Sequence, residues 1–225
     1  MKELKIIGNV FIPFIMAINI LLFSKAVMFY YCFRHHLTIM YINNSIYMKF
    51  AYVGSLLGDI STVIILLIIF IINKNKLQDF KNAFKLHIDK KHLLKMLSIT
   101  FILYLIVYLI QSLFIKKGIS TVPKYEIVII IFLIPFLEEI IFRFFILNGL
   151  RKHLNIYIVI LVQAMLFAFT HMIFNERAIF QGIYTFLLGI ILGFTYNKNK
   201  NLNESYCCHL FFNSMSLIII PLFCR

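Results

Sequence analysis

The chain alternates between long apolar runs and short polar or basic stretches. Seven runs are long enough, or nearly so, to cross a bilayer as helices, because about 20 apolar residues suffice. They are Ile6–Phe23, Phe50–Ile72, Met96–Ile115, Tyr125–Leu147, Ile156–Phe174, Ile179–Tyr196 and Tyr206–Phe223. No internal repeat or low-complexity linker separates them. The pattern therefore predicts an all-α, polytopic membrane protein with about seven, or eight, transmembrane helices in one integral-membrane domain over residues 1–225.

The stretch Asn73–Lys95, between the second and third runs, is rich in lysine. Its apolar residues recur at helical spacing, which predicts a basic amphipathic helix at the cytoplasmic surface: Leu77, Phe80, Phe84 and Ile88. The alternative is a solvated basic loop that only fixes orientation. Placing this stretch in the cytoplasm also puts most of the 22 Lys and Arg residues on that side, which predicts a cytoplasmic N-terminus.

Composition agrees with a membrane location. The chain is 62% hydrophobic and has a mean hydropathy of +0.92, whereas soluble domains are nearer half apolar. A net charge of +13 would suggest nucleic-acid binding in a soluble protein. Here the basic residues lie between the apolar runs, so they are topology signals. We expect a multi-pass protein of the cell membrane, with the lipid bilayer and not nucleic acid as its partner.

Within the fourth run, the stretch Ile127–Leu147 carries three charged residues, Glu138, Glu139 and Arg143. Charges in a bilayer cost several kcal/mol by insertion scales, so they indicate function. Glu139 and Arg143 are four residues apart on a helix and can neutralise each other. Glu138 lies about 100° away around the helix and has no partner in its own run. It is therefore the candidate general base, and the alternative is that it only bonds a neighbouring helix.

Two later runs carry the other candidate residues. His171 lies in the fifth run, and His209 and Asn213 share one helix face in the seventh. Each could be a packing residue or an interhelical hydrogen bond when taken alone. The rise of an α-helix, about 1.5 Å per residue, brings these residues and Glu138 to depths that tilt and side-chain reach can reconcile. A single intramembrane site is therefore permitted.

Three motifs now stand in order on successive helices: Glu138-Glu139-x-x-x-Arg143, Phe167-x-x-x-His171 and His209-x-x-x-Asn213. Together they resemble the motifs of the CPBP family, which comprises the CAAX prenyl endopeptidases and the bacteriocin-processing or immunity proteins, also called Abi proteins. The resemblance covers about Tyr125–Phe223, which would be the family's catalytic core.

The resemblance implies an intramembrane endopeptidase that hydrolyses a peptide bond of a membrane-associated peptide or membrane-anchored protein. Glu138 and His171 would activate a water molecule. His209 and Asn213 would form the oxyanion hole, the contribution that is usually largest in acyl transfer. Glu139 and Arg143 would hold the helix and the site in place.

Alternatives remain open at the level of mechanism and of function. We expect a glutamate-dependent reaction without a cofactor, but Glu138, His171 and His209 could instead hold a zinc ion with an open position for water. The usual HExxH helix is absent. A non-catalytic bacteriocin-immunity or scaffold protein is the alternative function. A transporter with Glu138 as proton carrier is a third, although no paired, interrupted segments support it.

Overall fold

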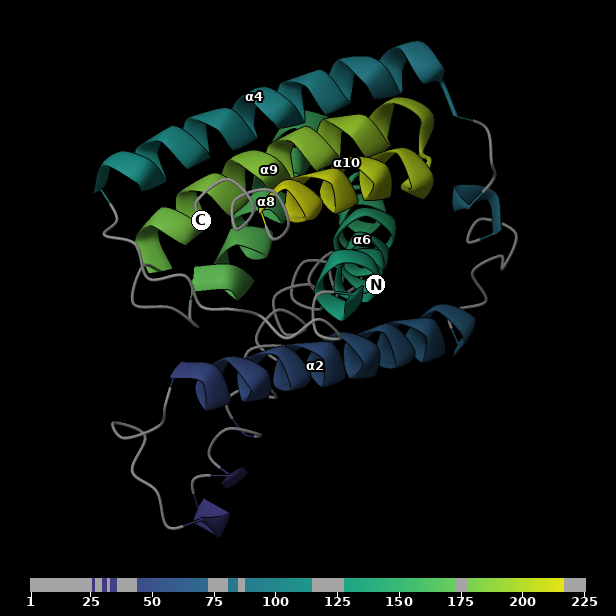
Figure 1. Cartoon of the computed structure of the whole chain (residues 1–225). Helices are drawn as coiled ribbons and strands as arrows, with labels where there is room; N and C mark the ends of the chain where they lie inside the picture. The colour runs from purple at the N-terminus through teal and green to yellow at the C-terminus, as the bar shows by residue number, and fades with distance from the viewer. Residues whose placement is uncertain are drawn as a thin grey trace.

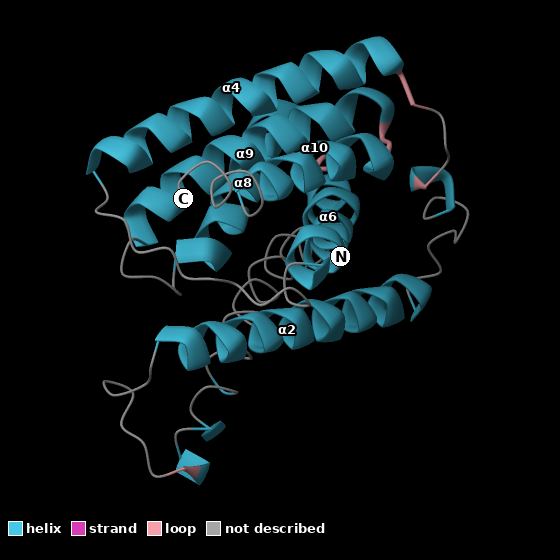
Figure 2. Ribbon diagram, in the orientation of Figure 1, coloured by secondary structure: helices cyan, strands magenta, loops and turns pink. Residues whose placement is uncertain are grey.

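The computed structural model describes residues 26, 30–31, 33–35, 44–72, 81–84, 88–114, 128–172 and 178–216. All regular structure in these ranges is helical, without a strand (Figure 2). The elements are α2 (Asn44–Ile72), α4 (Lys90–Phe114), η2 (Ile129–Leu133), α6 (Ile134–Glu139), η3 (Ile140–Leu147), α7 (Asn148–Leu150), α8 (Ile156–Met172), α9 (Ala178–Asn199) and α10 (Leu202–Ser214). The all-α prediction is thereby confirmed.

The number of membrane spans is a separate question. Within the described residues, Lys90–Ile110 and Ile179–Asn199 are long and apolar enough to cross a bilayer. Two shorter apolar helices, Leu56–Ile68 and Ile156–His171, accompany them. These lengths do not confirm the predicted count of seven. The first predicted run, Ile6–Phe23, lies outside the described residues, as does the end of the last.

The helices form two groups on either side of a central column. α4, α8, α9 and α10 pack together on one side, and α2 lies on the other (Figure 1). The column is the run η2–α6–η3–α7, which contacts α2, α8 and α10. Its most buried side chains, such as Ile141, Phe142 and Leu147, join those of α8 and α9 in one apolar core. The fourth predicted run is thus the centre of the fold.

The column is continuous in helical backbone but changes pitch along its length. A π-helical turn, η2, comes just before Pro135, and η3 follows Glu139. Proline has no N–H and its ring crowds the preceding turn, so a helix that contains it must deviate locally. In η2 the N–H of Ile134 donates to the carbonyl of Ile129, five residues back.

α8 and α9 approach each other closely at a glycine. A Cβ on Gly189 would lie 3.0 Å from Cα of Ala164, and the Gly189 carbonyl accepts a hydrogen bond of 2.8 Å from Nε2 of Gln163. Small residues at a helix crossing let backbones come close enough for such a bond.

A polar cluster joins α4, α9 and α10 at one end of the bundle. Glu204 is fully buried and accepts hydrogen bonds from the N–H of Asp89 at 3.0 Å and from Nδ2 of Asn199 at 2.9 Å. It also pairs with Nδ1 of His92 at 2.9 Å. Lys198 bonds the Asp89 carboxylate, and this bond holds the pKa of Asp89 below its ordinary value.

The amphipathic helix predicted over Asn73–Lys95 is only partly described. Lys81–Ala83 form a helical turn, Ile88 and Asp89 are irregular, and α4 already begins at Lys90. Phe84 packs against α6, with its ring centroid 5.9 Å from that of Phe136. Leu77 and Phe80 lie outside the described residues. The last lysines of the predicted segment therefore belong to α4, because the helix extends past the apolar run that defined it.

The close α8–α9 crossing leads to the first prediction. We expect Gly189→Val to lower the free energy of unfolding by about 1–3 kcal/mol, because the added side chain meets the Ala164 backbone. Gly149→Ala is the matched control, since nothing lies within 4 Å of its Cβ position. Unfolding of the purified proteins in mixed detergent measures both. Equal stability of Gly189→Val and the wild type would show that the two helices are not in close contact there.

Candidate active site

Glu139 and Arg143 form a buried ion pair on the central column. Nε of Arg143 lies 3.3 Å from Oε2 of Glu139, and both side chains are almost fully buried. Neither of these two atoms has a hydrogen-bond partner, so the contact between them is an ion pair without a hydrogen bond. Buried charges are tolerated only with such compensation.

α8 holds the guanidinium from the other side. Nη1 of Arg143 donates a 2.7 Å hydrogen bond to Oε1 of Gln163, and the Arg143 guanidinium carbon lies 5.1 Å from the ring centre of Phe167. Gln163 in turn donates to the carbonyl of Gly189. Arg143 is therefore fixed by α8, and through Gln163 by α9.

His209 from α10 bridges the two glutamates. Its Nδ1 lies 3.0 Å from Oε1 of Glu139, and its Nε2 lies 3.5 Å from Oε2 of Glu138. The ring is buried, with 2% exposed. Because Glu139 is ionised against Arg143, Nδ1 is the donor in the shorter contact.

His171 from α8 faces the other oxygen of Glu138. Its Nε2 lies 3.6 Å from Oε1 of Glu138, and its Nδ1 lies 2.9 Å from the carbonyl of Phe167. A carbonyl can only accept, so Nδ1 carries a proton. In the neutral ring Nε2 then presents a lone pair toward Glu138. Glu138 thus lies between two imidazole rings from different helices.

Asn213 lies apart from these charges. Its Nδ2 donates a 3.3 Å hydrogen bond to the carbonyl of Ile130 in η2. The structure therefore brings five of the six candidate residues into one polar cluster, which we call the Glu138 cluster: Glu138, Glu139, Arg143, His171 and His209. Asn213 is one turn farther along α10 and contacts the same column at another point.

Two residues of the surroundings were not anticipated. Asp59 in α2 is 1% exposed, interacts electrostatically with Glu138, and has an Oδ2 atom without a hydrogen-bond partner. It is a charged residue inside an apolar run, the same signal that marked the glutamates. Gln163 carries no charge and belongs to no motif, so only its contact with Arg143 reveals it.

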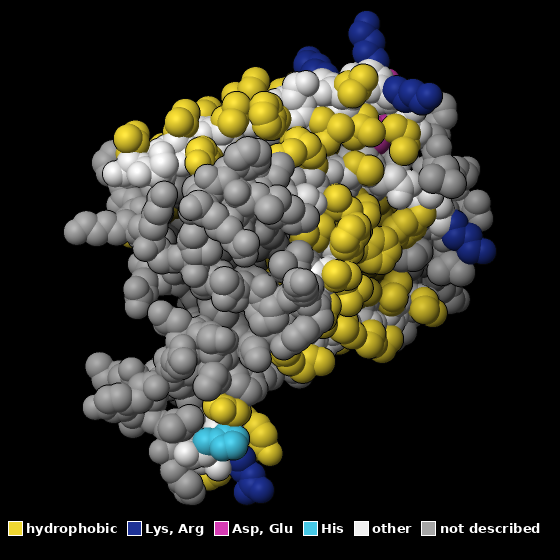
Figure 3. Space-filling model, viewed as in Figure 1, with side chains coloured by type: hydrophobic (Ala, Val, Ile, Leu, Met, Phe, Trp, Pro, Cys, Tyr) yellow, Lys and Arg dark blue, Asp and Glu magenta, His cyan; other side chains and the backbone are white. Residues whose placement is uncertain are grey.

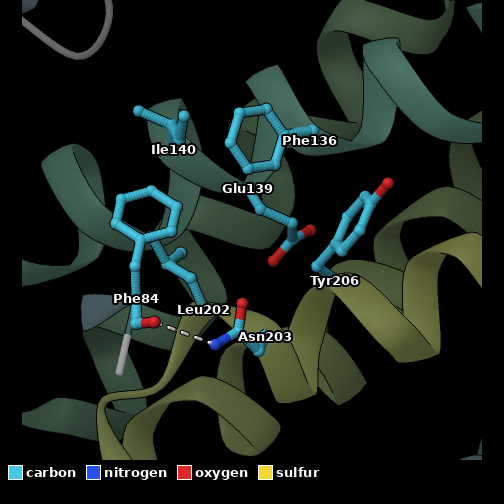
Figure 4. Close-up of a pocket in the computed structure, with 7 residues that line it drawn as sticks. All are labelled: Phe84, Phe136, Glu139, Ile140, Leu202, Asn203 and Tyr206. Carbon is cyan, nitrogen blue, oxygen red and sulfur yellow. Dashed lines mark hydrogen bonds between the residues drawn. The ribbon is translucent and has the colours of Figure 1, made fainter. Parts of the chain in front are cut away.

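A small pocket reaches Glu139 from another direction. It lies between Phe84, the end of α6 and the beginning of α10. In Figure 4 the Glu139 carboxyl group points into the space beside Tyr206, with Phe136 above it. Glu138 does not line this pocket. The pocket therefore borders Glu139 and not Glu138.

The sequence also left open a zinc site formed by Glu138, His171 and His209. Within the described ranges, no three His, Cys, Asp or Glu side chains are arranged to hold one metal ion. Glu138, His171 and His209 are neighbours, but they do not present such a ligand set together.

Comparison with known proteins finds one family model that matches part of the chain, the part that holds this cluster. Residues 120–215 match the Rce1-like type II CAAX prenyl endopeptidases. The resemblance to the CPBP family, drawn from three short motifs, is thereby confirmed, and the match spans all three of them. No curated protein and no solved structure matches the chain. The Rce1-like family is one of membrane-associated proteases.

The buried ion pair gives the second prediction. We expect Arg143→Met to lower the free energy of unfolding by about 3–5 kcal/mol, because it leaves the Glu139 carboxylate buried without its cation. The double variant Glu139→Gln/Arg143→Met should recover part of that loss. Arg151→Met is the control, since Arg151 is only half-buried and makes one long 3.5 Å bond to Asn148. A double variant no more stable than Arg143→Met would contradict the pairing.

Proposed function

We propose that this protein is an intramembrane endopeptidase of the glutamate-dependent kind. The observation that carries the proposal is the position of Glu138, buried and held between His171 and His209 within a segment that matches CAAX prenyl endopeptidases. A carboxyl group beside an imidazole, with a second imidazole on its other side, can accept a proton from water and pass it on.

Glu138 and His171 would activate the water. Oε1 of Glu138 and Nε2 of His171 are 3.6 Å apart, close enough for both to accept a hydrogen bond from one water molecule. The water oxygen forms a bond to the peptide carbonyl carbon while its proton moves to Glu138. The C–N bond then breaks and Glu138 returns that proton to the leaving nitrogen. The products are a carboxylic acid and an amine, and the two side chains end as they began.

His209 and Asn213 would stabilise the oxyanion. One N–H of the Asn213 amide is bonded to Ile130, so the second is available for a developing negative charge. Nδ1 of His209 is bonded to Glu139, and Nε2 can therefore donate only when the ring carries both protons. Glu139 is already paired with Arg143, so these two residues would hold the arrangement in place. Asn213 would be a hydrogen-bond donor to the oxyanion, because an asparagine side chain cannot act as a base.

We place this chemistry in a multi-pass protein of the cell membrane with a cytoplasmic N-terminus. Hydrophobic side chains cover much of the described part of the face seen in Figure 3, and Lys and Arg lie at its edges. Exposed apolar residues are numerous along α2 and α4, as expected for helices that face lipid. The substrate would be a peptide or membrane-anchored protein that reaches the site from the bilayer.

Zinc remains the competing mechanism for the same residues. If the reaction needed a metal, Glu138, His171 and His209 would be its ligands, and the metal would polarise the water in place of the glutamate. We favour the metal-free reaction, because the usual HExxH helix is absent and the possible ligands come from three helices. Cleavage that continues in excess chelator, by protein whose zinc content is measured, would support this choice.

The central prediction concerns Glu138. We expect purified wild-type protein to cleave a fluorescence-quenched peptide that ends in a prenylated CaaX sequence. Glu138→Gln should lower kcat by about 10²–10⁴-fold, because general-base catalysis contributes that much. His171→Ala should show a comparable loss, and Asn213→Ala about 10²-fold or more.

Asn203→Ala is the matched control for Asn213, because it removes an amide from the same helix outside the Glu138 cluster. It should leave kcat within a few-fold of wild type. Glu138→Gln that cleaves as fast as wild type would overturn the proposal. A wild-type protein that cleaves no peptide, but whose protective or binding activity survives alanine at Glu138 and His171, would favour the non-catalytic immunity or scaffold function.

A further inference from the structure

Pro135 leaves backbone carbonyls of the column without their usual donors. In an α-helix the carbonyl of Ile130 would accept from the N–H of Ile134, but that N–H donates instead to Ile129. Continuing the π-helical pattern would pair Ile130 with residue 135, which is proline and has no N–H. The Ile130 carbonyl is thus an acceptor that its own helix does not satisfy in either pattern.

α10 supplies a donor to that carbonyl. Nδ2 of Asn213 bonds it at 3.3 Å. A second donor from α10 reaches the same turn, since the hydroxyl of Tyr206 donates to the carbonyl of Phe132 at 3.0 Å. Tyr206 and Asn213 are seven residues apart, two helical turns, and therefore lie on one face of α10. Two side-chain bonds thus join this face of α10 to the irregular turn before Pro135.

His209 lies between these two contacts on α10. It is three residues after Tyr206 and four before Asn213, so all three share the face that meets the column. From this face His209 reaches Glu138 and Glu139. The bonds to Ile130 and Phe132 therefore fix the register of the helix that carries both proposed oxyanion donors.

We infer that Pro135 is a positioning residue for Asn213: it frees the Ile130 carbonyl, which then holds one N–H of the Asn213 amide and leaves the other directed to the reaction. In its catalytic part this inference rests on the proposed function. In its structural part, the coupling of Pro135 to Asn213 through one carbonyl, it stands without it.

Replacing the proline tests the coupling. Pro135→Ala restores an N–H, lets the column relax toward a regular α-helix, and allows Ile134 to bond Ile130 in place of Asn213. Because alanine is far better than proline inside a helix, the variant should be at least as stable as wild type. Its kcat for the prenylated peptide should nevertheless fall about 10-fold or more, with KM within about two-fold, since only an interaction of the transition state is lost. A merely structural proline would not give a protein that is equally stable and less active.

The matched control is Leu133→Ala, which also introduces alanine into the column. Leu133 is 41% exposed. This control should leave kcat unchanged within about two-fold, because a leucine side chain has no hydrogen-bonding group and the change leaves Pro135 in place. The double variant Pro135→Ala/Asn213→Ala should be no less active than Asn213→Ala alone, because both changes remove the same donor. Losses that multiply in the double variant would overturn the inference.

A double-mutant cycle measured by thermal unfolding tests the coupling of Pro135 to Asn213 without any substrate. Asn213→Ala leaves the Ile130 carbonyl unpaired in wild type, so it should lower the midpoint of thermal unfolding by about 2–4 °C. In the Pro135→Ala background Ile134 supplies the donor, and the same change should lower the midpoint by less than half as much. Equal shifts in both backgrounds would refute the coupling. A wild type that cleaves no peptide, together with unequal shifts, would refute the proposed function and sustain the coupling.

Discussion

Burying a carboxylate and a guanidinium inside an apolar helical bundle is the constraint on which the rest of this structure depends. Glu139 and Arg143 neutralise each other, but each has further hydrogen-bonding capacity that the interior must satisfy. Gln163 accepts a hydrogen bond from the guanidinium, and His209 forms a hydrogen bond with the carboxylate. The pair therefore ties α8 and α10 to the central column, and the remaining helices pack around this connection.

The arrangement that we propose to be catalytic depends on that connection. Once His209 is held by Glu139, its other nitrogen is directed toward Glu138, and His171 approaches Glu138 from α8. The two adjacent glutamates thus differ in their partners, and this difference is why we propose different roles for them. Glu139 is compensated by the cation of Arg143. Glu138 faces two imidazole rings and interacts with the buried Asp59, and in the proposed mechanism it exchanges a proton with water.

Much of the helical bundle and of the candidate site was predictable from the sequence. The features that were not predictable depend on tertiary packing. Helical periodicity and the cost of buried charge indicated the bundle, the charge pair and the three motifs. Helix ends were less predictable, since α4 extends into the basic stretch as far as Lys90. The contacts of Gln163 and of the Ile130 carbonyl depend on tertiary packing that no local pattern encodes. Asp59 was detectable, because it too is a charge in an apolar run. The seven spans stay a prediction.

The most direct test of the account is whether the first and third motifs interact energetically in the folded protein. A double-mutant cycle with Glu139→Gln and His209→Gln, measured by unfolding in mixed detergent, gives that interaction as a free energy. We predict a coupling of about 1–3 kcal/mol, as expected for groups in one buried network. Additive effects, within about 0.5 kcal/mol, would contradict it, because residues without shared contacts behave in that way.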